Sequence, residues 1–364
     1  MSNRVAIVGV GQSVHADERH DVDVAELVLE AVDEALGDAG LGLGDMENAV
    51  TACMDFWDGR TIANMSTAEV VGSYRKSEAR TCADGIQAML YEWTRIASGT
   101  FKIGLVAAHC VESRGVIPDI ERNATDVFTQ WPLGIDGSTI AGFGARLLYE
   151  SGAFSPRDAA EAVVESRRRG ARNPKVAPLP QVTVDEVLGS PVLADPIRLL
   201  DRAPNRDGST AFVVVSEDVA KGLDVEPVWV TGTAAVTGSY WSDADPTSTA
   251  TLEAARDTAV AMAGWAGAGA DLVEMSAQFS HQHLQYARAF GRDPLDERLN
   301  SSGGWLGGNP FIVTGAARIA EAVHQIRGTA GDRQLDGVHR AIAHGVHGLG
   351  AQTHSVAVLE GGAA

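Results

Sequence analysis

The feature that most constrains this sequence is an internal repeat, because the second half of the chain follows the same order of elements as the first. The opening RVAIVGVGQS, at 4–13, has the apolar run of a buried strand that leads into a glycine turn, and PVWVTGTAAV, at 227–236, repeats it. A helix is expected after each strand, from Val24 and from Thr249 through Ala266. The two strand-and-helix pairs therefore begin two equivalent units.

The correspondence continues to the end of each half. HRAIAHGVHG, at 339–348, stands where FKIGLVAAHC stands at 101–110, and both are typical of strands. GAQTHSVAVLEGG, at 350–362, closes the chain as DGSTAFVVVSED, at 207–218, closes the first half. One β-α-β-α-β-α-β-β unit used twice explains this order and predicts an α/β fold.

Two such units would pack helices between two sheets around a pseudo-twofold axis. We expect an N-terminal half at 1–222 and a C-terminal half at 223–364. The first half holds an insertion at about 115–205, where strand alternation stops, and a long segment of this kind is typically functional. A helix is expected within it from Pro156 to Arg172.

A cysteine stands at the start of one predicted helix, in RTCADGIQAMLYEWTRIASG at 80–99. Apolar residues recur at spacings of three and four along this helix, and Cys82 comes just before them. Unpaired backbone N–H groups and the helix dipole favour an anion there, so a thiol loses its proton more easily and becomes a better nucleophile. A small buried structural cysteine is the alternative interpretation. The second half has a similar glycine-led helix at 309–328, and we expect a site where the two helices meet.

The net charge, the lack of long apolar runs and the cysteine content restrict the partners and the cellular location that are expected. The net charge of -19 argues against a nucleic acid partner, because phosphate binding needs basic residues gathered on one face. No apolar run reaches the roughly 18 residues that a membrane span needs, and no leader precedes the first strand, so a cytoplasmic location is expected. The cysteines Cys53, Cys82 and Cys110 lack CxxC spacing, which predicts reduced thiols, no disulfide framework and no metal site.

Two further stretches bear on ligands. GVGQS, at 9–13, lacks the third glycine and the acidic residue of a dinucleotide fingerprint, so such a cofactor is not expected. The basic SRRRGARNPK, at 166–175, is either a solvated helix end or a clamp for a small phosphorylated ligand.

Three motifs resemble those of the thiolase superfamily, and within it the sterol-carrier-protein type thiolases, the lipid-transfer-protein thiolases of steroid side-chain breakdown and the acetyl-CoA acetyltransferases. TCADGIQA, at 81–88, is similar to the CAxGxxA motif, which implies that Cys82 accepts the acyl group. NSSGGWLGGNPFIVTGAARIAE, at 300–321, is similar to the GG...GHPxGxxGxR block. AHGVHGLGAQ, at 343–352, stands where thiolases carry CxGGGxG with their second catalytic cysteine.

The resemblance implies a thiolase fold, with duplicated halves in a five-layer α/β/α/β/α sandwich and a loop insertion in the first half. The basic SRRRGARNP is similar to the insertion-domain helix that lies along coenzyme A. This likeness and the glycine block imply that Arg168, Arg172, Gly303 and Gly304 bind the cofactor portion of the substrate. Coenzyme A would enter as part of an acyl-CoA, with no cofactor bound permanently.

Three positions depart from the family motifs. In GNP, at 308–310, Asn309 replaces the histidine of GHP; its amide can donate to an oxyanion but cannot exchange a proton near neutral pH. SAQF, at 276–279, replaces the NEAF or HDCF box. His344 and His347 stand where the second cysteine is absent.

These departures leave two reactions open. Thiolytic acyl transfer would use Cys82 as the acyl acceptor and His344 or His347 as the base. Both histidines could face the pocket only if their stretch is a turn. Retro-aldol cleavage of a β-hydroxyacyl-CoA would not acylate Cys82, and it fits the altered motifs somewhat better. His281 and His283 are weaker candidates, because a spacing of two on a helix points side chains apart.

A different class of function is a non-catalytic or half-catalytic subunit. Such a subunit would bind acyl-CoA and work with another thiolase-like chain or with a small OB-fold, zinc-ribbon protein. A homodimer or a hetero-oligomer is implied by the resemblance. The loop GVIPDIERNATDVFTQW, at 115–131, is where a partner or a bulky substrate would act.

Overall fold

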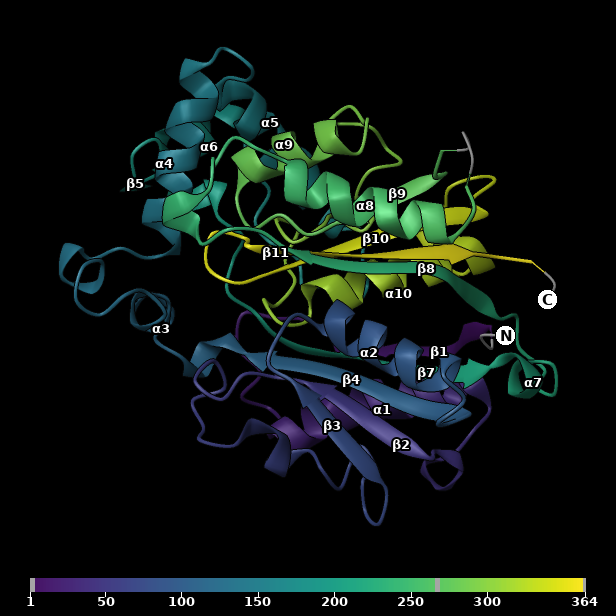
Figure 1. Ribbon diagram of the computed structural model, residues 1–364. Helices are drawn as coiled ribbons and strands as arrows, with labels where there is room; N and C mark the ends of the chain where they lie inside the picture. The colour runs from purple at the N-terminus through teal and green to yellow at the C-terminus, as the bar shows by residue number, and fades with distance from the viewer. Residues whose placement is uncertain (1–3, 266–268, 363–364) are drawn as a thin grey trace.

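The computed structural model describes residues 4–265 and 269–362, and its main strands form two sheet regions, one in each half of the chain (Figure 1). The strands of the first region are β1 (Val5–Gln12), β2 (Asn48–Ala52), β3 (Ser77–Thr81), β4 (Ile103–Val111) and β7 (Asp207–Ser216). They lie in the order β3-β2-β4-β7-β1. The neighbours β3, β2 and β4 run parallel, and β7 is antiparallel to both β4 and β1.

The second region repeats this arrangement. Its strands are β8 (Val228–Thr237), β9 (Leu272–Met275), β10 (Arg340–His347) and β11 (Thr353–Glu360), in the order β8-β11-β10-β9. Short antiparallel pairing between β1 and β8 joins the two regions into one nine-stranded sheet. Counted outward from that junction, the order is β1, β7, β4 and β2 in the first region and β8, β11, β10 and β9 in the second. In both regions these are the first strand along the chain, the last strand, the strand before the last and the second strand. The duplicated α/β architecture that the repeat predicts is therefore confirmed.

Helices lie in three layers around the two sheet regions. They are α1 (Val24–Ala39), α2 (Gly85–Ala97), α8 (Ala250–Met262), α9 (Ser280–Ala289) and α10 (Thr314–Arg327). α1 packs on the outer face of the first region and α8 on the outer face of the second, whereas α2 and α10 lie between them (Figure 1). α10 is buried on nearly all sides because sheet regions cover it from above and below. The layers follow the five-layer order implied by the family resemblance.

Local signals set the helix ends. Asp23 and Glu26 form a capping box at the start of α1, and Gly40 ends that helix with a φ of 66°. The helix predicted from Thr249 is α8, which ends at Met262; Ala266, the last residue of the predicted range, lies outside the described residues.

The segment between β4 and β7 holds the inserted elements, at the upper left of Figure 1. They are α3 (Ile117–Asn123), α4 (Gly137–Glu150), α5 (Pro156–Gly170), α6 (Val184–Gly189), and the hairpin strands β5 (Val192–Ala194) and β6 (Ile197–Arg198). α5 ends two residues before the predicted Arg172 and packs against α9. The boundary between the halves at 222 and 223 stays a prediction; it falls between the short helix α7 (Glu217–Ala220) and β8.

One strand escapes the sequence pattern. The chain enters β3 before the Cys82 helix, where sequence analysis places no strand. The five residues SEART are mostly polar and form the edge of the sheet, so they lack the apolar alternation by which strands are found. In the second half the equivalent place holds only a parallel bridge between Val273 and Leu299. Of the helices in the described part of the chain, none is long and apolar enough to cross a membrane.

Candidate active site

Cys82 stands in the turn between β3 and α2. β3 ends at Thr81 and α2 begins at Gly85, so the cysteine comes three residues before the first helical residue. Its thiol is exposed, whereas Cys53 and Cys110 are buried. Cys82 is therefore the one of these three thiols that a thioester or an alkylating reagent can reach.

Asp84 joins the two glycine-led helices at their N-termini. Its Oδ1 accepts a hydrogen bond from the Ile86 N–H at 2.9 Å, which caps α2, and its Oδ2 accepts from the Gly315 N–H of α10 at 3.0 Å. Complete burial raises the pKa of the Asp84 carboxyl to about 7. A Cβ on Gly315 would lie 2.0 Å from Asp84 Oδ1, so only glycine fits at this contact. The two helices meet where the sequence predicts, although the part played by Asp84 is not visible from spacing.

A cavity of about 710 Å³ opens between the inserted elements and the loops of the second half. Its volume is in the range of small-molecule sites. Phe311 forms part of the wall; its ring lies 4.4 Å from that of Trp57 and 5.5 Å from that of Trp305, measured between centroids. Within residues 4–265 and 269–362, the lining includes neither Cys82 nor Asn309. The lining of this cavity therefore does not include the exposed thiol.

Histidines line this cavity from three elements. They are His281 on α9, His347 at the end of β10 and His354 on β11. Burial lowers the pKa of His281 to about 3 and that of His354 to about 4, and it lowers the pKa of His347 as well. All three rings are therefore neutral at pH 7, and each has a nitrogen that can take a proton.

His344 is not among the residues that line the cavity. Residues three apart on a strand face opposite sides, and the turn needed for both to face the pocket is absent from β10. His344 is fully buried, and its Nε2 lies 3.0 Å from Nδ1 of His354, with the two rings stacked. His344 thus reaches the cavity only through His354.

Asn309 is buried and held by two neighbours. Its Nδ2 donates to Nδ1 of His15 at 3.0 Å, and its Oδ1 accepts from the Arg318 guanidinium. Arg318 in turn pairs with Glu274 at 2.8 Å, and both side chains are fully buried. Burial lowers the pKa of His15 to about 3, which keeps that ring neutral and able to accept the amide hydrogen. One N–H and the oxygen of the Asn309 amide are therefore hydrogen-bonded within the protein.

Ser276 is occupied in a similar way. Its Oγ lies 3.1 Å from Oγ1 of Thr314, and its N–H donates to the His344 carbonyl at 3.1 Å. Of the SAQF residues, Gln278 and Phe279 line the cavity.

Comparison with known proteins agrees with the fold. Residues 298–361 match the model of the thiolase C-terminal domain-like family. The chain is 30% identical to an acetyl-CoA acetyltransferase of Methanothermobacter thermautotrophicus, over 95% of this chain and 97% of that one.

The chain belongs to the thiolase family.

Other relatives match this thiolase-family chain over most of its length. It is 25% identical to sterol carrier protein 2 of Gallus gallus, over 96% of this chain and 70% of that protein. It is 26% identical to a steroid side-chain-cleaving aldolase of Thermomonospora curvata, over 89% and 90% of the two chains. The solved structure of the Ltp2-ChsH2(DUF35) aldolase superposes with a TM-score of 0.82 at 22% identity and covers 98% of both chains. That likeness shows the fold.

The residues that the family resemblance assigns to coenzyme A lie at the C-terminal end of α5. Arg168 is engaged by Glu165 at 2.6 Å, whereas Arg172 is exposed. Gly303 and Gly304 are buried with φ values of 98° and 65°. A Cβ on Gly303 would lie 2.6 Å from the Gly170 nitrogen, so these glycines let the loop pack closely against the helix end.

Some cavity residues could not be found from the sequence of this thiolase-family chain. Glu121 of α3 lines the cavity, with its carboxylate 3.6 Å from Arg202, and burial raises the pKa of that carboxyl. Its place in an irregular insertion gives no periodic signal. His354 lies on β11, where the sequence has the pattern of an ordinary strand and gives no sign of a site. A buried cluster of Cys53, Asp58 and His109, in which only His109 is far away in the sequence, also brings three possible metal ligands together.

Proposed function

We propose that this thiolase-family chain acts on an acyl-CoA and cleaves the carbon–carbon bond next to the thioester by a retro-aldol reaction. The observation that carries the proposal is a ligand-sized cavity lined by neutral histidines, with Cys82 outside its lining. The kinship with a steroid side-chain-cleaving aldolase supports a steroid or similarly bulky acyl group.

The proposed substrate is a β-hydroxyacyl-CoA, and His347 is the proposed base. His347 lines the cavity, and its Nδ1 is buried without a hydrogen-bond partner among the described residues. A rotation of the ring would turn this free nitrogen toward the cavity, where it would accept the proton of the β-hydroxyl group. The bond between Cα and Cβ then breaks, and its electron pair moves into the thioester as an enolate. The imidazolium returns the proton to Cα. The products are a carbonyl compound and a shorter acyl-CoA, and no second thiol is consumed.

Thiolysis is the competing reaction. It would need Cys82 as acyl acceptor and an oxyanion donor. Asn309, whose oxygen is bonded to Arg318 and one N–H to His15, has one N–H left for that role. Thiolysis would also consume one molecule of free coenzyme A for each bond broken. Turnover of a β-hydroxyacyl-CoA without added coenzyme A therefore supports the retro-aldol reaction. Thiolysis acts on a β-ketoacyl-CoA, because a thiol must attack a carbonyl at Cβ. Cleavage of the matching β-ketoacyl-CoA only when free coenzyme A is present, with no turnover of the β-hydroxyacyl-CoA, therefore contradicts the retro-aldol reaction.

We further propose that the end of α5 holds the coenzyme A portion through Arg172, with Arg168 beside it. Arg172 is exposed, and a phosphate is the group that an arginine at this place would pair with. Arg172→Ala is expected to raise KM for the acyl-CoA several-fold and leave kcat unchanged. Arg157→Ala, at the other end of α5, is the matched control.

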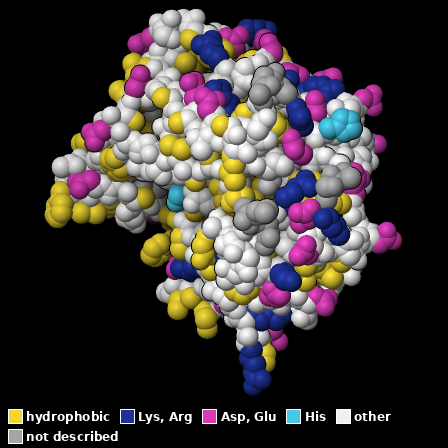
Figure 2. All heavy atoms as spheres, turned by 45° about the vertical axis from the view of Figure 1, so that its right-hand side comes forward, with side chains coloured by type: hydrophobic (Ala, Val, Ile, Leu, Met, Phe, Trp, Pro, Cys, Tyr) yellow, Lys and Arg dark blue, Asp and Glu magenta, His cyan; other side chains and the backbone are white. Residues whose placement is uncertain are grey.

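A second candidate function is that of a subunit that needs a partner. The observation in its favour is a group of exposed apolar side chains beside the cavity: Phe56, Phe128, Leu133 and Phe143 are 76%, 86%, 75% and 58% exposed. The projecting lobe at the left of Figure 2 carries hydrophobic side chains of this kind. An OB-fold, zinc-ribbon protein or a second thiolase-like chain is the proposed partner. Activity of the purified chain alone between about pH 6 and 9 would contradict this candidate.

A further inference from the structure

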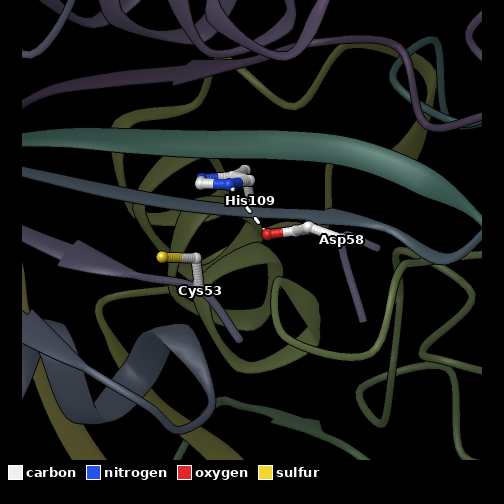
Figure 3. A group of neighbouring side chains, drawn as sticks. All are labelled: Cys53, Asp58 and His109. Carbon is white, nitrogen blue, oxygen red and sulfur yellow. Dashed lines mark ion pairs between the residues drawn. The ribbon is translucent and has the colours of Figure 1, made fainter. Parts of the chain in front are cut away.

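We propose that Cys53, Asp58 and His109 form a binding site for a zinc ion, independent of the proposed reaction. Figure 3 shows the three side chains together, with His109 facing Asp58. One ligand atom from each residue, a thiol sulfur, a carboxylate oxygen and an imidazole nitrogen, lies within 4.8 Å of the others. All three residues are buried.

The sheet brings these residues together. Ala52 of β2 pairs in register with Ala108 of β4, so the next residues, Cys53 and His109, leave neighbouring parallel strands at the same level. Cys110 packs in the core between the sheet regions, and since side chains alternate along a strand, His109 faces the opposite side. The loop after β2 then returns Asp58 to the same place, where its Oδ1 accepts the Val111 N–H at 2.9 Å.

Two of the possible ligand atoms are left without a hydrogen bond. Asp58 Oδ2 and His109 Nε2 lie 3.1 Å apart, yet neither makes a hydrogen bond of good geometry within the described residues. Burying a carboxylate oxygen and an imidazole nitrogen in this way is costly unless a cation or a donor satisfies them. An ion placed between these atoms and the Cys53 sulfur would satisfy both.

The donor set indicates zinc. Thiolate sulfur with imidazole nitrogen suits a borderline-soft ion, and a carboxylate is a common third ligand. Zinc bonds of about 2.0–2.3 Å place tetrahedral ligand atoms about 3.3–3.8 Å apart, so a contraction of about 1 Å by side-chain rotation would close the site. The fourth position would hold water, as in zinc sites with three protein ligands.

Such an ion would fix one wall of the cavity. Cys53 and Asp58 bracket the segment that holds Met54, Phe56 and Trp57, and all three of these line the cavity. The ion would tie both ends of that segment to β4. Its expected role is therefore structural.

The test is the metal content of the whole chain, expressed with zinc and then gel-filtered. We expect about one zinc ion per wild-type chain and less than about a tenth of that in Cys53→Ser and His109→Gln. Cys110→Ser is the matched control, because it removes an equally buried thiol from the next position of β4, and it should keep the ion. Cys82→Ser controls for binding at the exposed thiol and should also keep it.

Cobalt gives a second readout that does not depend on activity. Wild-type chain loaded with Co²⁺ should show a thiolate-to-metal charge-transfer absorption that Cys53→Ser lacks and Cys110→Ser retains. Wild-type chain that holds no zinc after loading overturns the proposal, whether or not the variants fold. Zinc that persists in Cys53→Ser, or that is lost only in Cys82→Ser, overturns it as well.

Discussion

At the scale of single residues, the proposed chemistry depends on which polar groups line the cavity and which already make hydrogen bonds within the protein. His347 lines the cavity and has a buried Nδ1 without a hydrogen-bond partner among the described residues, whereas Asn309 gives one N–H to His15 and its oxygen to Arg318. The sequence could identify His347 as a candidate from its place in the altered motif. It could not separate His347 from His344, because that depends on whether the stretch is a strand or a turn.

His347→Gln should lower kcat by about 10²- to 10⁴-fold and leave KM almost unchanged. The amide keeps much of the shape of the ring but cannot take the hydroxyl proton. The measurement is the steady-state release of the shorter acyl-CoA. His324→Gln, on α10 and away from the cavity lining, is the control and should retain full activity. An equal loss in both variants would mean that His347 has no special role.

The pH profile should follow the lowered pKa of His347. A base works in its deprotonated form, and burial moves the pKa of this ring below 6.5, so the active form persists on the acid side of that value. We expect kcat/KM to stay constant from about pH 8 to about pH 6.5 and to fall only below that range. A fall that begins above pH 7 would show that another group is the base.

At the scale of elements, the contact between the N-termini of α2 and α10 holds the first half of the chain against the second. Two backbone N–H groups share one buried carboxyl there, at Asp84. The sequence predicts that these helices meet, because both follow a glycine-rich start. Spacing could not show that an N-cap residue of one helix also binds the other.

Asp84→Asn should lower the free energy of unfolding by about 1–3 kcal/mol, because an amide offers one acceptor oxygen to two buried N–H groups. Asp23→Asn is the matched control, since Asp23 also caps a helix but is exposed, and asparagine is an equally good cap there. Urea unfolding of both variants measures the difference. Equal, small effects would show that the Asp84 contact to Gly315 adds nothing.

Two glycine-to-alanine substitutions distinguish a glycine that close packing requires from one that only adds backbone flexibility. Gly315→Ala should destabilise the chain by about 1–3 kcal/mol or more, because its Cβ would meet Asp84 at 2.0 Å. Gly37→Ala, within α1, has no atom within 4 Å of the new Cβ and should stabilise the chain by about 0.5–1 kcal/mol. Thermal unfolding followed by circular dichroism compares the two. A stable Gly315→Ala variant would contradict the close approach.

At the scale of the whole molecule, the repeat in the sequence predicted the duplicated sheet because strand and helix periods recur in the same order in each half. The polar strand β3 could not be predicted from the sequence pattern, because an edge strand needs no apolar face. The cavity could not be predicted, because its wall combines α3 and α4 of the insertion with the ends of β10 and β11. Such a wall depends on how distant elements pack, which no local pattern records.

The exposed apolar lobe gives a prediction at this scale. Phe128→Ser together with Leu133→Ser should change the free energy of unfolding by less than about 0.5 kcal/mol, because both side chains are exposed. If a partner covers the lobe, the double variant should lose the complex in size-exclusion chromatography while the chain stays folded. A complex that forms unchanged would place the partner elsewhere.

The most direct test of the central claim compares Cys82→Ala with wild type on one β-hydroxyacyl-CoA, and on the matching β-ketoacyl-CoA with free coenzyme A. The intact mass of the wild-type chain is measured during each reaction. The retro-aldol account predicts that Cys82→Ala keeps its turnover within about twofold and that no acyl group is found on Cys82. No turnover of the β-hydroxyacyl-CoA by wild type, together with coenzyme A-dependent cleavage of the β-ketoacyl-CoA that Cys82→Ala lacks and an acyl adduct on Cys82, would contradict the account and establish thiolysis.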